Sequence, residues 1–228
     1  MMRLLRFFFY HFYHAFAWTY DLVAAVVSVG RWQEWVLSAL PYLRGPRVLE
    51  LGHGPGHLQL AGRQRGLAMF GLDESRQMGR MAFSRMARNG LEPRLSRGYA
   101  QAMPFKTGEL DEVVATFPTE YIFDPRTLAE ARRVLRPGGK LVVVPVAWIG
   151  GKNLSDRAAA WLFHVTQQGS PLTEAAQERI RTHFTAAGFE AEAESVEKAH
   201  STILVIVAKK PKNADGKGAA EAATTIMG

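Results

Sequence analysis

Hydrophobic residues in the middle of the chain gather in short runs separated by longer stretches with helical spacing. Glycine, proline or charged residues bound each run. Short apolar runs of this kind are typical of strands buried on both faces of a parallel sheet, with helices as the connections. The pattern predicts an α/β fold with strands at 48–51, 67–72, 110–115 and 140–145, helices after 56, at 128–135 and at 172–188, and a closing pair of strands at 190–199 and 202–208.

The first run leads directly into a glycine-rich loop, with Gly52, Gly54 and Gly56 at alternate positions. Glycines at a strand-to-helix turn permit positive φ and let a ligand approach the backbone, where the next helix offers free N–H groups. The needs of a tight turn also explain such a loop. Asp73 ends the second run at the spacing where an α/β nucleotide fold places a carboxylate on a ribose, although Asp is also favoured as a helix cap.

Four segments resemble the class I S-adenosylmethionine-dependent methyltransferases in their order and spacing. Besides the glycine-rich loop they are residues 98–105, 110–116 and 133–144, so the resemblance covers about residues 47–146. It implies a Rossmann-like, doubly wound, mostly parallel sheet of seven strands with an antiparallel last strand, and an N-terminal helical extension. It also implies S-adenosylmethionine as the cofactor. In outline the chain is most similar to the menaquinone and ubiquinone C-methyltransferases.

The resemblance places most cofactor contacts at the ends of the first two strands. The loop glycines would wrap the methionyl part, and the Asp73 carboxylate would accept hydrogen bonds from both ribose hydroxyls. Glu50 would lie near the amino-acid end of the cofactor or order the loop, and Met78 would contact adenine or lie in the core. The implied contacts are Tyr20, Glu50, Gly52, His53, Gly54, Gly56, Asp73, Glu74, Met78, Ala100, Gln101, Thr116 and Phe117.

Two features depart from the family pattern. Where the family commonly has an acid for the adenine amino group, this chain has Tyr99, so an adenine contact would come from its ring, a backbone group or Gln101. His53 and His57 occupy loop positions that more often carry small or hydroxyl residues. A histidine there could act as a base or orient the methionine carboxylate, or it could be a satisfied loop residue. The sequence identifies no catalytic residue.

The substrate side is predicted from the strand ends. Ligands of open parallel sheets lie outside the carboxyl ends of the strands, so the loop at 116–121 should face the methyl group. Quinone methyltransferases have a different loop that lacks Pro118, and the loop is not the Asn-Pro-Pro-Tyr type of nucleic-acid amino methyltransferases. Residues 148–168 follow the fifth strand, where this fold commonly inserts part of a lid. We expect substrate contacts from Tyr13, Glu120, Tyr121 and Trp148.

Residues 4–29 are rich in aromatic side chains and long enough to be tested as a membrane span. An aspartate near the centre of a bilayer costs roughly 3 kcal/mol, so the polar positions argue against a transmembrane helix. An interfacial helix at a membrane surface and a helix packed on protein both remain open. The polar positions are Arg6, His11, His14 and Asp21.

Tyr20-Asp21 and residues 28–35 resemble the segment that leads into the first strand of the quinone methyltransferases and helps to cover the cofactor. Trp32 and Trp35 within it are also explained as core aromatics at helical spacing.

Composition limits the remaining alternatives. The 228 residues suit one domain, predicted at 46–210, with an aromatic extension or lid at 1–45 and a disordered tail at 211–228. Hydrophobic content of 47% excludes a disordered protein, and the lack of cysteine excludes disulfides and thiolate metal sites, so no metal is expected. The formal charge of +7 favours acidic partners such as anionic lipid surfaces or nucleic acid.

The leading prediction is methyl transfer to a small-molecule or lipid-like acceptor, such as a quinone precursor or a phospholipid headgroup. The protein would act in the cytoplasm, with residues 1–29 as the segment that would meet a membrane surface. One alternative is a nucleic-acid methyltransferase, suggested by charge alone and opposed by the absence of a basic strip interleaved with aromatics. Another is a cofactor-binding scaffold without chemistry, suggested by Tyr99 and the altered loop. The oligomeric state is not predicted.

Overall fold

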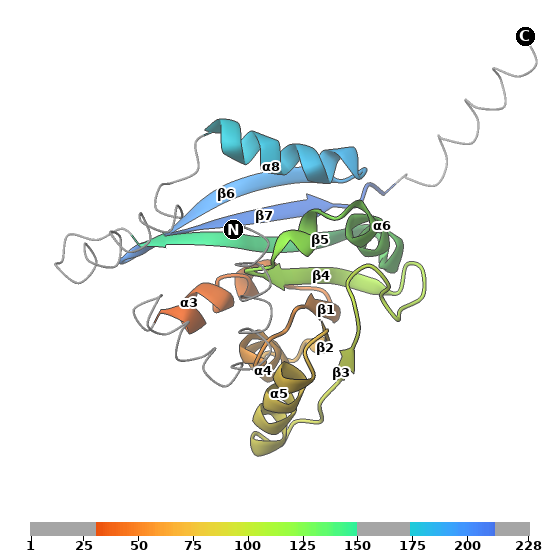
Figure 1. Cartoon of the computed structure of the whole chain (residues 1–228), viewed down its shortest axis with the longest axis vertical. Helices are drawn as coiled ribbons and strands as arrows, with labels where there is room; N and C mark the ends of the chain where they lie inside the picture. Colours follow the sequence, from red (N-terminus) through yellow and green to blue (C-terminus); the bar gives the residue numbers. More distant parts are fainter. Residues whose placement is uncertain (1–30, 150–173, 213–228) are drawn as a thin grey trace, which may run out of the picture.

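The computed structural model describes residues 31–149 and 174–212, which form a seven-stranded sheet with helices on both faces (Figure 1). The strand order is β3-β2-β1-β4-β5-β7-β6. Neighbouring strands are parallel except at β7, which runs antiparallel to both β5 and β6. The predicted mostly parallel sheet with an antiparallel last strand is therefore confirmed. The strands are β1 (Arg47–Leu51), β2 (Ala68–Asp73), β3 (Leu95–Arg97), β4 (Leu110–Thr116), β5 (Leu135–Ile149), β6 (Glu190–Lys198) and β7 (Ser201–Lys209).

Two elements begin earlier than predicted because of local backbone chemistry. Helix α6 begins before the predicted residue 128 because the Asp124 side chain caps it and Pro125 takes its first position. Strand β5 begins before the predicted residue 140 because the backbone on both sides of its Pro-Gly-Gly segment stays paired, with the Gly138 N–H donating to the Lys210 carbonyl. The helices are α3 (Trp32–Leu37), α4 (His57–Gln64), α5 (Arg76–Arg88), α6 (Pro125–Val134) and α8 (Glu174–Ala186), with short 3₁₀ helices η2 (Leu40–Tyr42) and η3 (Glu120–Phe123).

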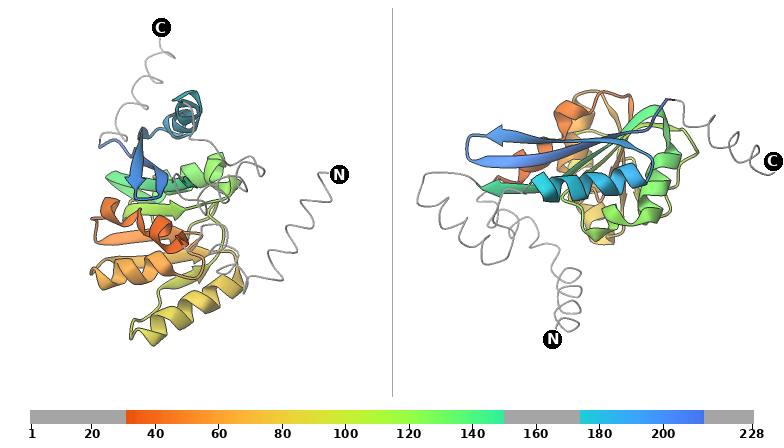
Figure 2. Two further views of the ribbon diagram at one scale, coloured as in Figure 1. Left: turned by 90° about the vertical axis from the view of Figure 1, so that its left-hand side faces the viewer. Right: turned by 90° about the horizontal axis from the view of Figure 1, so that it is seen from above.

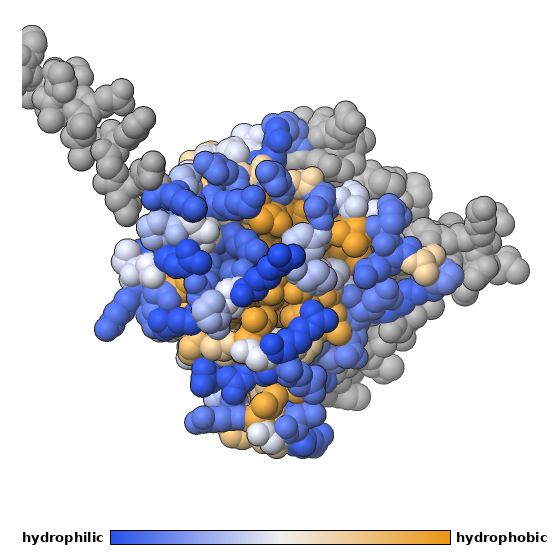
Figure 3. Space-filling model, turned by 180° about the vertical axis from the view of Figure 1, so that it is seen from behind, coloured by the Kyte–Doolittle hydropathy of each residue, from blue (hydrophilic) through white to orange (hydrophobic). Residues whose placement is uncertain are grey.

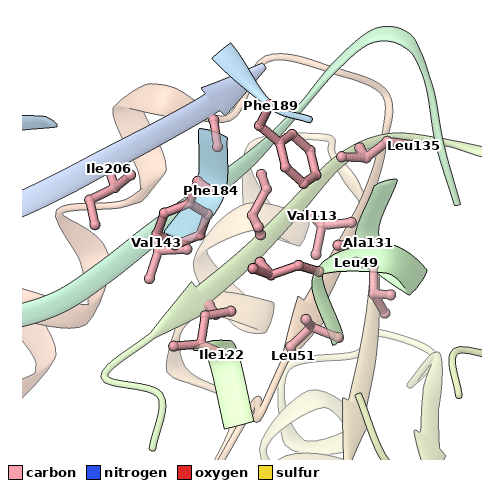
Figure 4. Close-up of a cluster of buried hydrophobic side chains, with 14 of the residues drawn as sticks. Leu49, Leu51, Val113, Ile122, Ala131, Leu135, Val143, Phe184, Phe189 and Ile206 are labelled. Atoms are coloured by element: carbon pink, nitrogen blue, oxygen red, sulfur yellow. The ribbon is translucent and has the colours of Figure 1, made fainter. Parts of the chain in front are cut away.

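Two hydrophobic clusters lie on the opposite faces of the sheet. Helices α3 and α4 cover one face, and α6 and α8 cover the other (Figure 2). Consecutive strand residues alternate between the clusters, as Val142 and Val143 do in β5. Figure 4 shows the second face, where Phe184 of α8 and Ala131 of α6 pack over the strand side chains. Helix α5 lies next to α4 and contacts β2 and β3.

The two tryptophans of α3 have different surroundings. Trp35 is 2% exposed in the core, and its indole N–H donates to the Ser201 hydroxyl over 3.0 Å. Trp32 is half-buried, and its ring centroid lies 4.7 Å from that of Phe117 at the end of β4. Trp35 is thus a core aromatic, and Trp32 joins the core to the loop that follows β4.

Several predictions concern parts of the chain outside the described residues. These are the aromatic segment at 4–29, the lid from 150 onward and the tail beyond 212. Within the described ranges, none of the helices combines the length and hydropathy needed to cross a membrane. The face of the molecule seen in Figure 3 is largely hydrophilic, with hydrophobic patches between the polar groups.

Candidate functional site

A pocket of about 210 Å³ opens at the carboxyl ends of β1, β2 and β4, the edge of the sheet at which the sequence predicts a ligand. The loops after these strands, the loop after β3 and the first turn of α5 form its walls. Most of the predicted cofactor contacts come together here. The structure places Gly52, Gly54, Asp73, Glu74, Met78, Ala100, Gln101, Thr116 and Phe117 on the pocket wall.

The three loop glycines serve different purposes. Gly52 has φ +63°, and a Cβ there would lie 2.8 Å from the Tyr121 hydroxyl. Gly54 has φ +52° with open space around it, so its backbone is accessible to a ligand. At Gly56 a Cβ would lie 2.9 Å from the Cβ of Ala82, so this glycine permits close packing of the loop on α5. Gly52 and Gly54 line the pocket, whereas Gly56 does not.

Asp73 is held rigidly at the pocket edge by backbone groups. One carboxylate oxygen accepts from the Gly54 N–H over 2.9 Å, and the other accepts from the Ser75 N–H over 2.8 Å. Because the Ser75 hydroxyl caps α5, the alternative of Asp73 as the helix cap is wrong. A carboxylate offers about four acceptor positions, so about two remain for a ligand. That number suits the pair of hydroxyls on a ribose.

Glu50 lies behind the glycine loop and does not line the pocket. Its side chain is on the α4 face of β1, where it is 1% exposed and accepts a hydrogen bond from the Gln59 amide over 2.8 Å. The same amide donates to the Phe70 carbonyl over 3.0 Å. Burial raises the pKa of Glu50 to about 8. The Gln59 hydrogen bond joins β1 to α4, and no side-chain hydrogen bond among the described residues supports either predicted role, beside the cofactor or in ordering the loop.

His53 is also turned away from the pocket. The ring is 4% exposed, and its Nδ1–H donates to the Gly54 carbonyl over 2.7 Å. It packs so closely on β2 that a Cβ at Gly71 would lie 2.8 Å from the His53 ring. Burial lowers the pKa of His53, which favours the neutral ring. This environment agrees with a satisfied loop histidine, and the predicted contact to the cofactor has no support from the geometry.

The wall after β3 carries Tyr99, which is 64% exposed, and Gln101. The Gln101 amide nitrogen donates to a carboxylate oxygen of Asp124 over 3.1 Å. Hydrogen bonds from Arg126 hold the pKa of Asp124 far below its usual range, so this acceptor stays charged. The Gln101 carbonyl oxygen is then left as an acceptor for an amino group. Sequence reasoning missed Asp124, although the Asp-Pro pair at the start of α6 signals an oriented carboxylate.

The loop after β4 is fixed in an unusual conformation. Phe117 has φ +49°, the only positive value at a non-glycine residue among the described residues. Its N–H donates to the Val144 carbonyl over 2.7 Å, and its ring packs on Trp32 and Trp35. Backbone strain of this kind persists only where the surroundings over-determine it, and it is concentrated at functional sites. The packing thus sets the position of the next two residues on the pocket wall.

The predicted substrate contacts have four different positions. The Tyr121 hydroxyl donates to the Leu51 carbonyl over 3.2 Å, and the ring lines the pocket beside Gly52. Glu120 is exposed and does not line the pocket. Trp148 is 7% exposed and lies in the hydrophobic cluster under α6 and α8, which gives its predicted contact no support. Tyr13, like the predicted cofactor contact Tyr20, lies outside the described residues.

Residues 48–139 match a family model described as a methyltransferase domain. Similar curated proteins include two demethylmenaquinone methyltransferases. The protein of Renibacterium salmoninarum is 34% identical over 128 residues, which are 54% of this chain and 52% of that protein. The protein of Thermus thermophilus is 34% identical over 131 residues, which are 55% of this chain and 60% of that protein. The matched parts thus span just over half of each of these relatives.

Solved structures share the arrangement of the sheet. One is phosphoethanolamine N-methyltransferase 2 of Haemonchus contortus, in complex with phosphomonomethylethanolamine and S-adenosylhomocysteine. It superposes with a TM-score of 0.56 at 20% identity, over 80% of this chain and 53% of that one. At this identity the likeness shows the fold alone.

Proposed function

Residues 48–139 belong to a methyltransferase domain, and from this premise we propose that the chain transfers a methyl group from S-adenosylmethionine to a small, lipid-like acceptor. The observation that carries the proposal is the placement of Asp73. Two backbone N–H groups fix its carboxylate at the edge of a pocket whose other wall is the accessible backbone of Gly52 and Gly54. A nucleoside joined to an amino acid needs these two surfaces next to each other.

The residues of the pocket fit the parts of this cofactor. The remaining acceptor positions of Asp73 suit the ribose hydroxyls, and the Gln101 carbonyl suits the adenine amino group that an acid binds elsewhere in the family. Met78 is 3% exposed and lines the pocket, which suits the apolar face of adenine. The backbone at Gly52 and Gly54 suits the methionyl part.

S-adenosylmethionine supplies a methyl group on a positively charged sulfur, ready for in-line displacement. The protein has to align the acceptor with that methyl group and exclude water. Tyr121 and Phe117 suit this purpose, since the first is tied to Leu51 and the second is wedged against two tryptophans. Within the described part of the wall, the carboxylates are Asp73 and Glu74 and histidine is absent.

We infer that the acceptor is a quinol of the demethylmenaquinone type. The names of the two curated relatives support this class. A quinol also loses a phenolic proton easily, so its carbon nucleophile needs less help from a base than an ammonium group would. The loop at 116–121 differs from that of the quinone methyltransferases, so the shape of the acceptor is expected to differ as well.

Calorimetric titration of S-adenosylhomocysteine into the wild type and Asp73→Asn tests the cofactor site. Loss of the charged acceptor should cost roughly 1.5–3 kcal/mol of binding free energy. Glu92→Gln removes the same charge from an exposed position outside the pocket and should bind like the wild type. An analogue of S-adenosylhomocysteine without the 2′-hydroxyl separates a ribose contact from loop disorder. If Asp73 contacts the ribose, the wild type should prefer S-adenosylhomocysteine to the analogue, and Asp73→Asn should show a smaller preference. An equal loss for both ligands would contradict the ribose assignment.

The acceptor is tested by transfer of a labelled methyl group from S-adenosylmethionine. A short-chain demethylmenaquinol, phosphoethanolamine and total RNA are offered in parallel, with detergent present in each. Transfer to the quinol is the expected result, and Asp73→Asn should abolish most of it. Transfer to RNA alone would replace the proposal with a nucleic-acid methyltransferase. Tight cofactor binding with no transfer to any acceptor would favour the scaffold.

A further inference from the structure

The outward face of α5 carries three exposed arginines and one exposed aromatic ring. Arg76, Arg80 and Arg88 are exposed, and Phe83 between them is 57% exposed. The helix has no acidic residue. Its inner face, formed by Met78, Ala82 and Met86, is buried, so the helix is anchored while its cationic face points outward.

These arginines differ from most others of the described chain in having no partner within it. Arg76, Arg80 and Arg88 make no ion pair or side-chain hydrogen bond among the described residues. Five other arginines are paired with carboxylates. Arg47 pairs with Glu109, Arg126 with Asp124, Arg133 with Glu130, Arg136 with Asp111, and Arg181 with Glu178.

A groove of about 510 Å³ runs between α5 and β3 beside this face. Arg76, Arg80, Phe83 and Arg97 line it. The one carboxylate on its wall is Asp73, which already accepts two backbone hydrogen bonds. The groove shares Asp73 with the candidate cofactor pocket, so the two sites adjoin.

We propose that this face of α5 docks on an anionic phospholipid surface. A guanidinium group binds phosphate oxygens through two parallel hydrogen bonds, and it stays charged at any physiological pH. The first and last arginines are twelve positions apart, which is about 18 Å along a helix, so they match a plane of several headgroups better than one free phosphate. Phe83 lies among them, where an aromatic ring can enter the boundary between headgroups and acyl chains.

The composition of the face decides between lipid and nucleic acid. Surfaces that bind single-stranded nucleic acid stack successive bases on several aromatic rings, whereas the outward face of α5 offers only Phe83. Docking through α5 would bring the membrane next to the candidate pocket, where a lipid-like acceptor would enter. Binding to vesicles needs neither cofactor nor turnover, so the docking surface stands or falls independently of the proposed reaction.

Co-sedimentation of the full chain with vesicles tests the docking surface. Vesicles of phosphatidylcholine mixed with phosphatidylglycerol are compared with vesicles of phosphatidylcholine alone. Each basic residue near an anionic surface strengthens binding by about five-fold, so Arg76→Gln with Arg80→Gln should weaken it about 25-fold. The matched control is Lys198→Gln with Lys209→Gln, which removes two exposed charges at the opposite edge of the sheet. Circular dichroism and urea unfolding verify that each variant is folded.

The expected result is selective binding to the anionic vesicles, lost in the α5 variant and kept in the control. Phe83→Gln should weaken binding further without changing its dependence on phosphatidylglycerol. Equal losses in the α5 variant and in the control would overturn the proposal, because any positive charge would then serve. Unchanged binding by the α5 variant would also overturn it. So would binding to single-stranded RNA, but not to vesicles, that depends on the same two arginines.

Discussion

Replacement of Glu50 by glutamine should make the protein more stable at alkaline pH and should flatten its pH dependence. Glu50 is 1% exposed, and its recorded side-chain partner is the Gln59 amide, which donates a single hydrogen bond. Burial therefore raises its pKa from 4.5 to about 8, with a smaller contribution from the charge of Asp73. A glutamine has nearly the shape of a protonated glutamate and cannot ionise, so it should fit the same site.

The sign follows from proton linkage. The folded state keeps a proton on Glu50 that the unfolded state releases above pH 4.5, so the wild type loses stability as the pH rises from 4.5 to about 8. At 1.36 kcal/mol per pH unit the full effect is on the order of 5 kcal/mol. Between pH 5.5 and 7.5 the wild type should lose roughly 2–3 kcal/mol relative to Glu50→Gln.

Urea unfolding of both proteins at pH 5.5, 6.5 and 7.5 measures this difference. Subtracting one protein's unfolding free energy from the other's at each pH removes contributions common to both. One of these comes from His53, whose lowered pKa makes stability rise with pH, opposite to the effect of Glu50. Glu92→Gln is the control for loss of an exposed carboxylate and should follow the wild type. Parallel curves for the wild type and Glu50→Gln would refute the reasoning, because Glu50 would then be as accessible to water in the fold as in the unfolded chain.

Two further predictions use matched substitutions. Gly54→Ala and Gly66→Ala should each cost about 1 kcal/mol of stability, since both glycines have positive φ and open space, whereas only Gly54→Ala should weaken cofactor binding in calorimetry. Equal weakening of cofactor binding by the two substitutions would show that backbone strain, and not loss of a contact at Gly54, is responsible. Trp35→Phe should cost about 1–3 kcal/mol in urea unfolding because it leaves the buried Ser201 hydroxyl without its donor, and adding Ser201→Ala should cost less than the two single changes together.

The fold and the pocket position were predictable because they depend on local patterns. Short apolar runs gave the strands, and the glycines with Asp73 located the pocket at the strand ends. The face of β1 on which Glu50 lies was not predicted from the motif. Leu49 and Leu51 point toward α6, so Glu50 between them points toward α4, and it does not line the candidate pocket. The resemblance assigned Glu50 to the cofactor from its position in the motif, and the alternation of the strand places it behind the loop.

Which cations remain unpaired on the folded surface is the feature that the sequence predicts least well. The chain has a formal charge of +7, and part of the excess comes from lysines near its end. In the fold, Arg136 forms an ion pair with Asp111, which is 25 positions away, and this carboxylate neutralises its charge. Arg76 and Arg80 find no such carboxylate among the described residues, because the neighbouring strand β3 and helix α4 contain no acid. Ion pairing between distant segments therefore determines which cations remain for a partner, and the exposed arginines of α5 are among them.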